Sequence, residues 1–268
     1  MNRLVVSSCA ALAIFAGAAT AQVVTIADGN SDAEFDLGGG GQFNWHVDGL
    51  DELFNQDFFF RAGAMTDELS VTSTGIVGHT LTDTNFFVDP RVDTLFVRYF
   101  DAPTGLEFDI RYSLQGGSAG SGTADLAEQI IIRNVGNAAT DVSFFQYVDF
   151  DLNGSSGGDV GEILNGRVAT QSEGGMSVTE TVVTPAPSFY DMKEFPDIIL
   201  NFFDGLPTTL SNDPGPVAGD LAWAFQWDFS LAPGQTFLIS KDKLITPAPG
   251  AIALLGIAGL AGCRRRRA

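Results

Sequence analysis

Oxygen-bearing side chains are concentrated in one stretch of the sequence, between residues 149 and 162. The candidate ligands are Asp149, Asp151, Asn153, Asp159 and Glu162. Their oxygens are hard ligands that suit Ca²⁺, and Gly154 allows the sharp bend of a calcium loop. Val160, however, stands where an EF-hand loop has its final Glu, and an aromatic, strand-like run precedes the loop. The stretch is therefore interpreted either as an irregular strand-to-loop Ca²⁺ site or as a solvated acidic loop at a strand end.

Patterns typical of enzymes are scarce. His46 and His79 are the only histidines, which leaves little room for a multi-histidine metal site or a Ser-His-Asp arrangement. No Gly-x-Ser-x-Gly elbow is present, and the glycine run at 38–41 lacks the Lys-Ser/Thr of a phosphate-binding loop. A glycosidase needs only two carboxylates, but no motif selects a pair among the 33 acidic residues. The sequence therefore predicts that the protein is not an enzyme.

The charge balance is strongly acidic. The chain of 268 residues carries 33 Asp and Glu against 14 Lys and Arg, a formal net charge of −19. The region between the two end segments contains nine of the basic residues and all 33 acidic ones, so its net charge is about −24. Such a surface repels phosphate backbones, so we expect no nucleic-acid partner. It also favours a bound divalent cation, which would relieve the repulsion between neighbouring carboxylates.

The elements that would position these side chains are predicted to be strands. Apolar and polar residues alternate from 106 to 114 and again from 223 to 229, as in half-buried antiparallel strands. Further strand-like runs cover 130–132 and 142–150, and these two are expected to form a meander with the run at 106–114. Pro233 and Gly234 fit a tight turn into a final strand at 235–240. We therefore predict an all-β fold, an antiparallel β-sandwich that forms a single large domain over residues 22–245 with about six or more strands per sheet.

The first 21 residues differ from the rest. Arg3 precedes an apolar run from Leu4 to Ala19, and the small residues Ala19 and Ala21 flank Thr20 at its end. A positive start, a short apolar run and a small-x-small ending are typical of a secretory signal peptide. We expect cleavage after Ala21 and export of the mature chain.

The last residues, 246–268, form a third segment. It opens with Pro247, Ala248, Pro249 and Gly250, continues through an apolar run at 251–263, and ends in Arg264, Arg265, Arg266 and Arg267. A helix of thirteen residues reaches about 20 Å, short of a hydrocarbon core of about 30 Å. The arginines resist translocation. We therefore expect a hydrophobic helix that holds the exported chain transiently in the inner membrane.

This ordered succession of prolines, apolar run and arginines resembles the PEP-CTERM sorting tail. Ala248 stands where that tail usually has Glu, and Cys263 offers an alternative processing point, as in related tails. The resemblance implies cleavage near the proline motif by an exosortase, a membrane transpeptidase. It also implies an exported bacterial protein that reaches the cell surface or extracellular matrix, in association with exopolysaccharide.

The combined prediction is a secreted structural or adhesive protein with Ca²⁺ as its one candidate cofactor. Two alternatives remain open at this point, a calcium-dependent carbohydrate-binding module and a carbohydrate-active enzyme built on the same sandwich.

Overall fold

A computed structural model of the chain describes residues 22–248. The predicted signal peptide with Ala19 and Ala21, and the sorting segment from Pro249 through Arg264, Arg265, Arg266 and Arg267, lie outside these residues. None of the helices within residues 22–248 is long and apolar enough to cross a membrane. Strand β18 (Thr236–Pro247) extends through Pro247, and the Ala248 N–H donates to the Gly175 carbonyl. The sheet therefore includes the first residues of the predicted sorting segment.

The described chain is mostly β-structure, arranged as two antiparallel nine-stranded sheets. Sheet A contains β1 (Val23–Asp28), β2 (Ser31–Asp36), β3 (Gly41–Val47), β4 (Leu50–Asp51), β5 (Asn55–Ala62), β6 (Leu69–Ser70), β11 (Thr140–Asp149), β15 (Phe189–Glu194) and β17 (Leu221–Leu231). Sheet B contains β7 (Gly75–Thr82), β8 (Thr94–Asp101), β9 (Leu106–Gly116), β10 (Ala124–Asn134), β12 (Asp159–Leu164), β13 (Val168–Glu173), β14 (Met176–Thr184), β16 (Val217–Gly219) and β18. The short helices are η1 (Val71–Ser73), η2 (Leu152–Gly154) and α1 (Asp197–Asn201).

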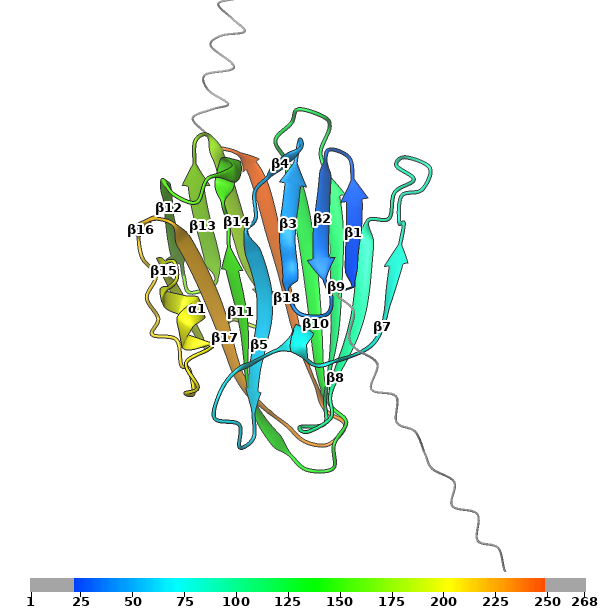
Figure 1. Cartoon of the computed structure of the whole chain (residues 1–268), viewed down its shortest axis with the longest axis vertical. Helices are drawn as coiled ribbons and strands as arrows, with labels where there is room; N and C mark the ends of the chain where they lie inside the picture. Colours follow the sequence, from blue (N-terminus) through cyan, green and yellow to red (C-terminus); the bar gives the residue numbers. More distant parts are fainter. Residues whose placement is uncertain (1–21, 249–268) are drawn as a thin grey trace, which may run out of the picture.

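Neighbouring strands in space are often distant in sequence. The order in sheet A is β1-β2-β3-β5-β11-β17-β15, with β4 beside β3 and β6 beside β5. The order in sheet B is β16-β12-β13-β14-β18-β10-β9-β8-β7. Figure 1 shows the two sheets stacked as layers, with β17, β5, β3 and β2 in the nearer one. The predicted β-sandwich is therefore confirmed at the level of two antiparallel sheets.

One apolar core fills the space between the sheets. Strand β9 shows why, since Leu106, Phe108 and Ile110 are buried while the residues between them are more polar. Aromatic rings from the two sheets meet in this core: the Phe60 and Phe108 centroids lie 4.7 Å apart. The chain has no cysteine between its two ends, so this packing takes the place of disulfide bonds in stabilising the fold.

The predicted meander is wrong in one connection. Strands β9 and β10 do pair, but β11 lies in the other sheet, between β5 and β17. Likewise Gly234 adopts the positive φ of 78° expected of a turn, yet the turn joins β17 in sheet A to β18 in sheet B. Both β11 and β17 bury side chains on both faces for much of their length. They therefore occupy the centre of a sheet that is covered on both sides.

A second, smaller apolar cluster covers the outer face of sheet A. Phe59 of β5 and Phe145 of β11 pack there against Phe202, with ring centroids 4.8 and 5.2 Å away. Phe202 directly follows α1, which Figure 1 shows beside β17 and β15. Helix α1 and the segment after it thus cover the middle of this face.

Buried charges tie the two sheets together through the core. Lys241 Nζ forms ion pairs with Glu128 and with Glu180, the latter at 3.0 Å, and Lys243 pairs with Glu128. All four side chains are almost completely buried. From sheet A, Gln56 donates to Glu128 at 3.0 Å, while Gln146 and Trp223 donate to Glu180, both at 2.8 Å. The charges balance within the network, which makes their burial tolerable.

Candidate functional site

The outward side chains of β11 connect two polar sites on sheet A. Because side chains alternate along a strand, Asp141, Ser143, Phe145, Tyr147 and Asp149 share the outer face. Phe145 and Tyr147 belong to the apolar cluster under α1 and its following segment. Asp149 follows Asp141 by eight positions along the strand, so the two ends lie about 26 Å apart. Each end carries a distinct group of polar side chains.

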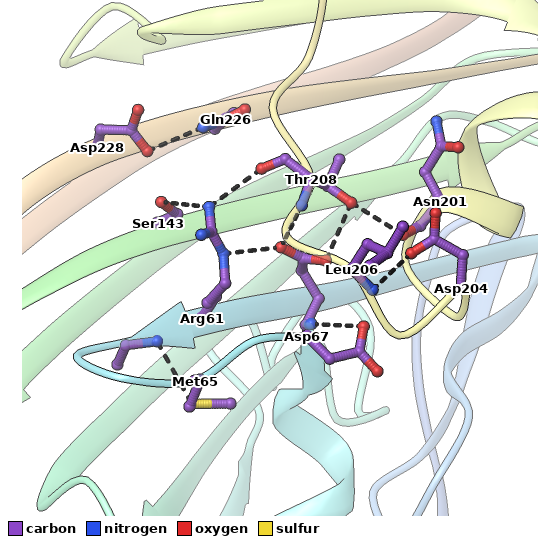
Figure 2. A network of polar contacts seen from close by, with 12 residues as sticks. Arg61, Met65, Asp67, Ser143, Asn201, Asp204, Leu206, Thr208, Gln226 and Asp228 are labelled. Carbon is purple, nitrogen blue, oxygen red and sulfur yellow. Dashed lines mark hydrogen bonds and ion pairs between the residues drawn. The ribbon is translucent and has the colours of Figure 1, made fainter.

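At the end near Asp141 the outer face forms a polar groove. Arg61 of β5, Ser143 of β11 and Asp228 of β17 stand directly opposite one another in the strand registers. Figure 2 shows these three side chains side by side across their strands. The next row contains Asp141 opposite Ser230, and a glycine, Gly63, beyond the end of β5. These residues line a hollow of about 340 Å³. The small serines and the glycine leave the space that the charged side chains surround.

The guanidinium of Arg61 is held in place by hydrogen bonds to neighbouring side chains and backbone. Its Nε donates to Glu68 Oε1 at 3.0 Å, and its Nη2 donates to Ser143 Oγ at 3.3 Å and to the Thr208 carbonyl at 3.1 Å. The Glu68 side chain is fully buried and also accepts hydrogen bonds from the Thr208 N–H and hydroxyl, both at 2.9 Å. Figure 2 shows Thr208 between Arg61 and the segment that carries Asn201 and Leu206. Arg61 is therefore a fixed cation at the edge of the groove.

The two carboxylates of the groove are exposed and lie on one face. Asp141 accepts a short hydrogen bond from Ser230 Oγ, and Asp228 accepts one from Gln226 Nε2 at 2.9 Å. Their diagonal positions on adjacent strands, Asp141 opposite Ser230 and Ser143 opposite Asp228, place their Cα atoms about 7–8 Å apart. A carboxylate pair with a guanidinium beside it can bind several hydroxyl groups of one polar ligand. The groove is thus chemically suited to a carbohydrate.

At the other end of β11 lies a group of carboxylates, here called the acidic cluster. Asp149, Asp151 and Asp220 each contribute an oxygen, and these oxygens lie within 4.8 Å of one another. The strand register explains the meeting. Asp149 pairs with Ala222. Asp151, two residues further along, therefore falls opposite Asp220, which directly precedes β17. The acidic loop predicted from the sequence is therefore completed by a residue from a distant segment.

Two carboxylates at the cluster are buried without full hydrogen bonding. Asp149 accepts a hydrogen bond from the Tyr147 hydroxyl at 3.0 Å, but its Oδ1 has no partner. Asp159 lies opposite Gly219, the residue before Asp220, and neither of its oxygens has a partner. Burial, with repulsion from neighbouring carboxylates, raises the pKa of both Asp149 and Asp159 to about 7. Each is only 1% exposed.

The remaining predicted ligands lie elsewhere. The Asn153 N–H donates to Glu52 Oε2 and its side-chain amide donates to the Glu173 carbonyl, both at 2.7 Å. Asn153 therefore connects the loop to the turn between β13 and β14. Glu162 is exposed on β12, at a position of opposite parity to the buried Asp159. Among the described residues the structure thus brings together Asp149 and Asp151, with Asp159 beside them, and leaves Asn153 and Glu162 outside the cluster.

Sequence reasoning missed Asp220 and the whole polar groove. Asp220 lies about 70 residues from the acidic loop, and local spacing carries no information on such a contact. One signal was present for the groove. Ser143 follows Asp141 by two residues, and Asp228 follows Gln226 by two, so polar side chains recur with period two at the ends of strongly apolar strands.

No protein-family model and no curated protein sequence matches this chain. Solved structures do match. A bacterial glucoamylase complexed with acarbose is 9% identical with a TM-score of 0.58, and the match covers 91% of this chain and 35% of the glucoamylase. The chain thus spans about a third of the length of that enzyme. A galactose mutarotase-like protein from Lactobacillus casei ATCC 334 is 9% identical with a TM-score of 0.49, over 84% of this chain and 100% of that one. A galactose mutarotase related enzyme from Lactobacillus acidophilus is similar to the same degree, with 9% identity and a TM-score of 0.49.

The likeness to the glucoamylase contradicts two predictions made from the sequence, a structural or adhesive role and the absence of enzymatic activity. The sandwich was interpreted as a structural scaffold because no catalytic motif stood out locally. That interpretation is wrong, since the same fold forms part of a carbohydrate-processing enzyme. At this level of identity the likeness concerns the fold, and it defines this chain as a large two-sheet sandwich of the kind found in that enzyme.

Proposed function

We propose that this protein is a carbohydrate-active enzyme that hydrolyses glycosidic bonds in the groove on the outer face of sheet A. The observation that carries this proposal is the exposed pair Asp141 and Asp228 facing one hollow beside the fixed cation Arg61. The hollow of about 340 Å³ is within the range of small-molecule sites. The fold shared with a glucoamylase supports the substrate class.

The spacing of the two carboxylates suggests the course of the reaction. Inverting glycosidases hold their carboxyl groups about 6.5–9.5 Å apart, which leaves room for a water molecule. The diagonal pair Asp141 and Asp228 has Cα atoms about 7–8 Å apart, a backbone separation that allows their carboxyl groups to adopt such a spacing. One carboxylic acid protonates the glycosidic oxygen as its bond to the anomeric carbon breaks. The other carboxylate takes a proton from the water that attacks this carbon. The acid is thus left deprotonated and the base protonated, and exchange with solvent restores both.

Arg61 and the serines would hold the sugar. The guanidinium can donate to ring or hydroxyl oxygens, and Ser143 and Ser230 can donate to or accept from hydroxyl groups. Glu68 would act as a positioning residue because it contacts Arg61 from behind. This arrangement places donors and acceptors on both sides of the hollow.

The test is hydrolysis of maltoheptaose and of a panel of soluble α- and β-linked glucans, followed as release of reducing ends. We expect turnover by the wild-type chain and a loss of 100-fold or more in kcat for Asp141→Asn and Asp228→Asn. Glu162→Gln, an exposed carboxylate on the other sheet, serves as the matched control and is expected to retain full activity. Absence of turnover on every glucan, or full activity of both groove variants, would contradict the proposal.

We also propose that the protein is exported and sorted by its ends. The signal-peptide pattern at 1–21 and the tail with Arg264–Arg267 support transient anchoring in the inner membrane, processing by an exosortase-type partner, and release to the cell surface near exopolysaccharide. Mass spectrometry of the native protein is expected to find neither residues 1–21 nor the arginine run. An intact C-terminus on secreted protein would overturn the sorting proposal and leave the enzymatic one unaffected.

A further inference from the structure

We propose that the acidic cluster at the end of β11 is a Ca²⁺ site, formed by Asp149, Asp151 and Asp220 with Asp159 beside them. This inference does not depend on the proposed hydrolysis, because the cluster and the groove lie at opposite ends of β11. Three oxygens within 4.8 Å of one another supply the first observation. The second is the pair of buried side chains Asp149 and Asp159, each only 1% exposed, which leave three oxygens without a hydrogen-bond partner.

These side chains lack the partners that buried carboxylates normally have. None of the four forms an ion pair with a Lys, Arg or His among residues 22–248. Three of their oxygens, Asp149 Oδ1 and both oxygens of Asp159, accept no hydrogen bond. Buried carboxylates are ordinarily paired, hydrogen-bonded or bound to a metal. The same fold does provide such pairing elsewhere, since Glu128 and Glu180 are fully buried against lysines. The cluster is therefore built for a cation that the chain itself does not supply.

The ligand type and the irregular loop favour Ca²⁺ over Mg²⁺. Ca²⁺ binds oxygens at about 2.3–2.6 Å, so two ligands on opposite sides of the ion can be about 4.8 Å apart. The three cluster oxygens fall within that separation as they stand. Mg²⁺ binds at about 2.0–2.1 Å with strict octahedral geometry and keeps several of its waters, so it is less suited to a site formed by several carboxylates of an irregular loop. Backbone carbonyls and water can complete the six to eight ligands of Ca²⁺ in this irregular loop.

The local backbone explains how the ligands converge. Asp149 ends β11, and Asp151 precedes η2, where Asn153 and Gly154 both adopt positive φ, 58° and 66°. This bend reverses the chain towards Asp159 at the start of β12. Hydrogen bonds from Asn153 to Glu52 and to the Glu173 carbonyl fix the bend, so Asn153 acts on the loop instead of on the ion. Asp220 enters from the link between β16 and β17.

The experiment is thermal unfolding of the purified chain, freed of metal by a chelator, with CaCl2 added from micromolar to millimolar concentrations. We expect Tm to rise with the logarithm of the Ca²⁺ concentration above Kd, by about 5–10 °C at a hundred times Kd, and the chelator to reverse the rise. MgCl2 at the same concentrations is expected to give a much smaller shift. Isothermal titration with CaCl2 gives an independent stoichiometry, expected to be one tight site per chain.

The variants Asp151→Asn and Asp220→Asn are expected to abolish both the shift and the tight site. They keep the side-chain shape and remove repulsion, so without Ca²⁺ their Tm is expected to equal or exceed that of the wild type. Glu162→Gln, from the same acidic stretch but outside the cluster, is the matched control and is expected to keep the full shift. A Ca²⁺ shift that is absent, that MgCl2 reproduces at the same concentrations, or that persists in both cluster variants would overturn the proposal.

Discussion

Single residues fix the geometry of the groove, and Glu68 shows how. Its buried carboxylate connects Arg61 of β5 to the Thr208 backbone, so three segments meet at one side chain. We expect Glu68→Ala to lower the free energy of unfolding by about 2–4 kcal/mol, because a half-buried guanidinium and the Thr208 N–H lose their partner. Urea denaturation measures this change. Glu162→Gln changes an exposed side chain, so it is expected to change the free energy of unfolding by less than about 0.5 kcal/mol. Equal stability of the two variants would show that Arg61 is held by its other contacts.

A second residue makes stability depend on pH. Burial raises the pKa of Asp57 to about 7, although the Ser70 hydroxyl and the Phe58 N–H donate to it. The folded state therefore retains a proton that the unfolded state releases near pH 4. The stability from this group is fully present below about pH 4 and is lost as pH rises to about 7, a change of about 4 kcal/mol.

Replacing Asp57 by Asn removes this titration. We expect the free energy of unfolding of Asp57→Asn, compared with that of the wild type, to fall less steeply between pH 4 and pH 7. Urea denaturation at several pH values measures both slopes, and the difference isolates Asp57 from the other raised carboxylates. Parallel slopes would show that Asp57 is ionised in the folded protein throughout this range.

At the scale of elements, sequence patterns predicted the strands better than their partners. The alternation at 106–114 identified the strand that β9 forms, because one of its faces is buried and the other is exposed. Residues 144–149 are buried on both faces, so the same rule could not say which neighbour they meet. Strand β11 pairs with β17, some 80 residues later, and this pairing alone brings Asp149 to Asp220 and Asp141 to Asp228. Local spacing therefore identified part of the acidic cluster and missed both Asp220 and the groove.

The cover formed by α1 and the following segment separates the two sites on sheet A, and it depends on Phe202. This ring is fully buried against Phe59 and Phe145, whereas its neighbour Phe203 is 68% exposed. We expect Phe202→Ala to cost about 3–5 kcal/mol in unfolding free energy, and Phe203→Ala less than about 1 kcal/mol. Hydrogen exchange of residues 197–210 is expected to speed up in Phe202→Ala alone. Unchanged exchange there would mean that other contacts hold the cover.

At the scale of the whole molecule, a network of buried lysines and glutamates joins the two sheets. Lys241 lies between Glu128 and Glu180, to which sheet A donates hydrogen bonds through Gln56, Gln146 and Trp223. Burial raises the pKa of Glu128, but the charges of Lys241 and Lys243 outweigh burial and lower it to about 2. The carboxylate therefore stays ionised inside the core. This network could not be predicted from the sequence, because Lys241 and Lys243 stand near the predicted end of the domain, far along the chain from Glu128 and Glu180.

Removing one lysine would leave two buried carboxylates short of a partner. We expect Lys241→Met to destabilise the protein by about 3–5 kcal/mol. The matched control is Lys193→Met, since Lys193 pairs with Asp191 at 3.0 Å but is 28% exposed and its partner has other hydrogen bonds. For this control we expect about 1 kcal/mol or less. Denaturant unfolding compares them, and similar losses would show that the core network contributes no more than a surface pair.

The net charge of −19 acts on the molecule as a whole, and salt separates its effect from those of the buried groups. The Debye length falls from about 30 Å at 0.01 M to about 3 Å at 1 M ionic strength, so surface carboxylates cease to repel one another. The core lysines and glutamates lie out of reach of the solvent ions. We therefore expect Tm to rise with NaCl, gradually and without saturation at low concentration, in the wild type and in Asp151→Asn alike. A Ca²⁺ shift that disappears in Asp151→Asn would then be distinct from screening, because NaCl acts on both proteins alike. A Tm that falls with NaCl would mean that attractive surface pairs outweigh the repulsion.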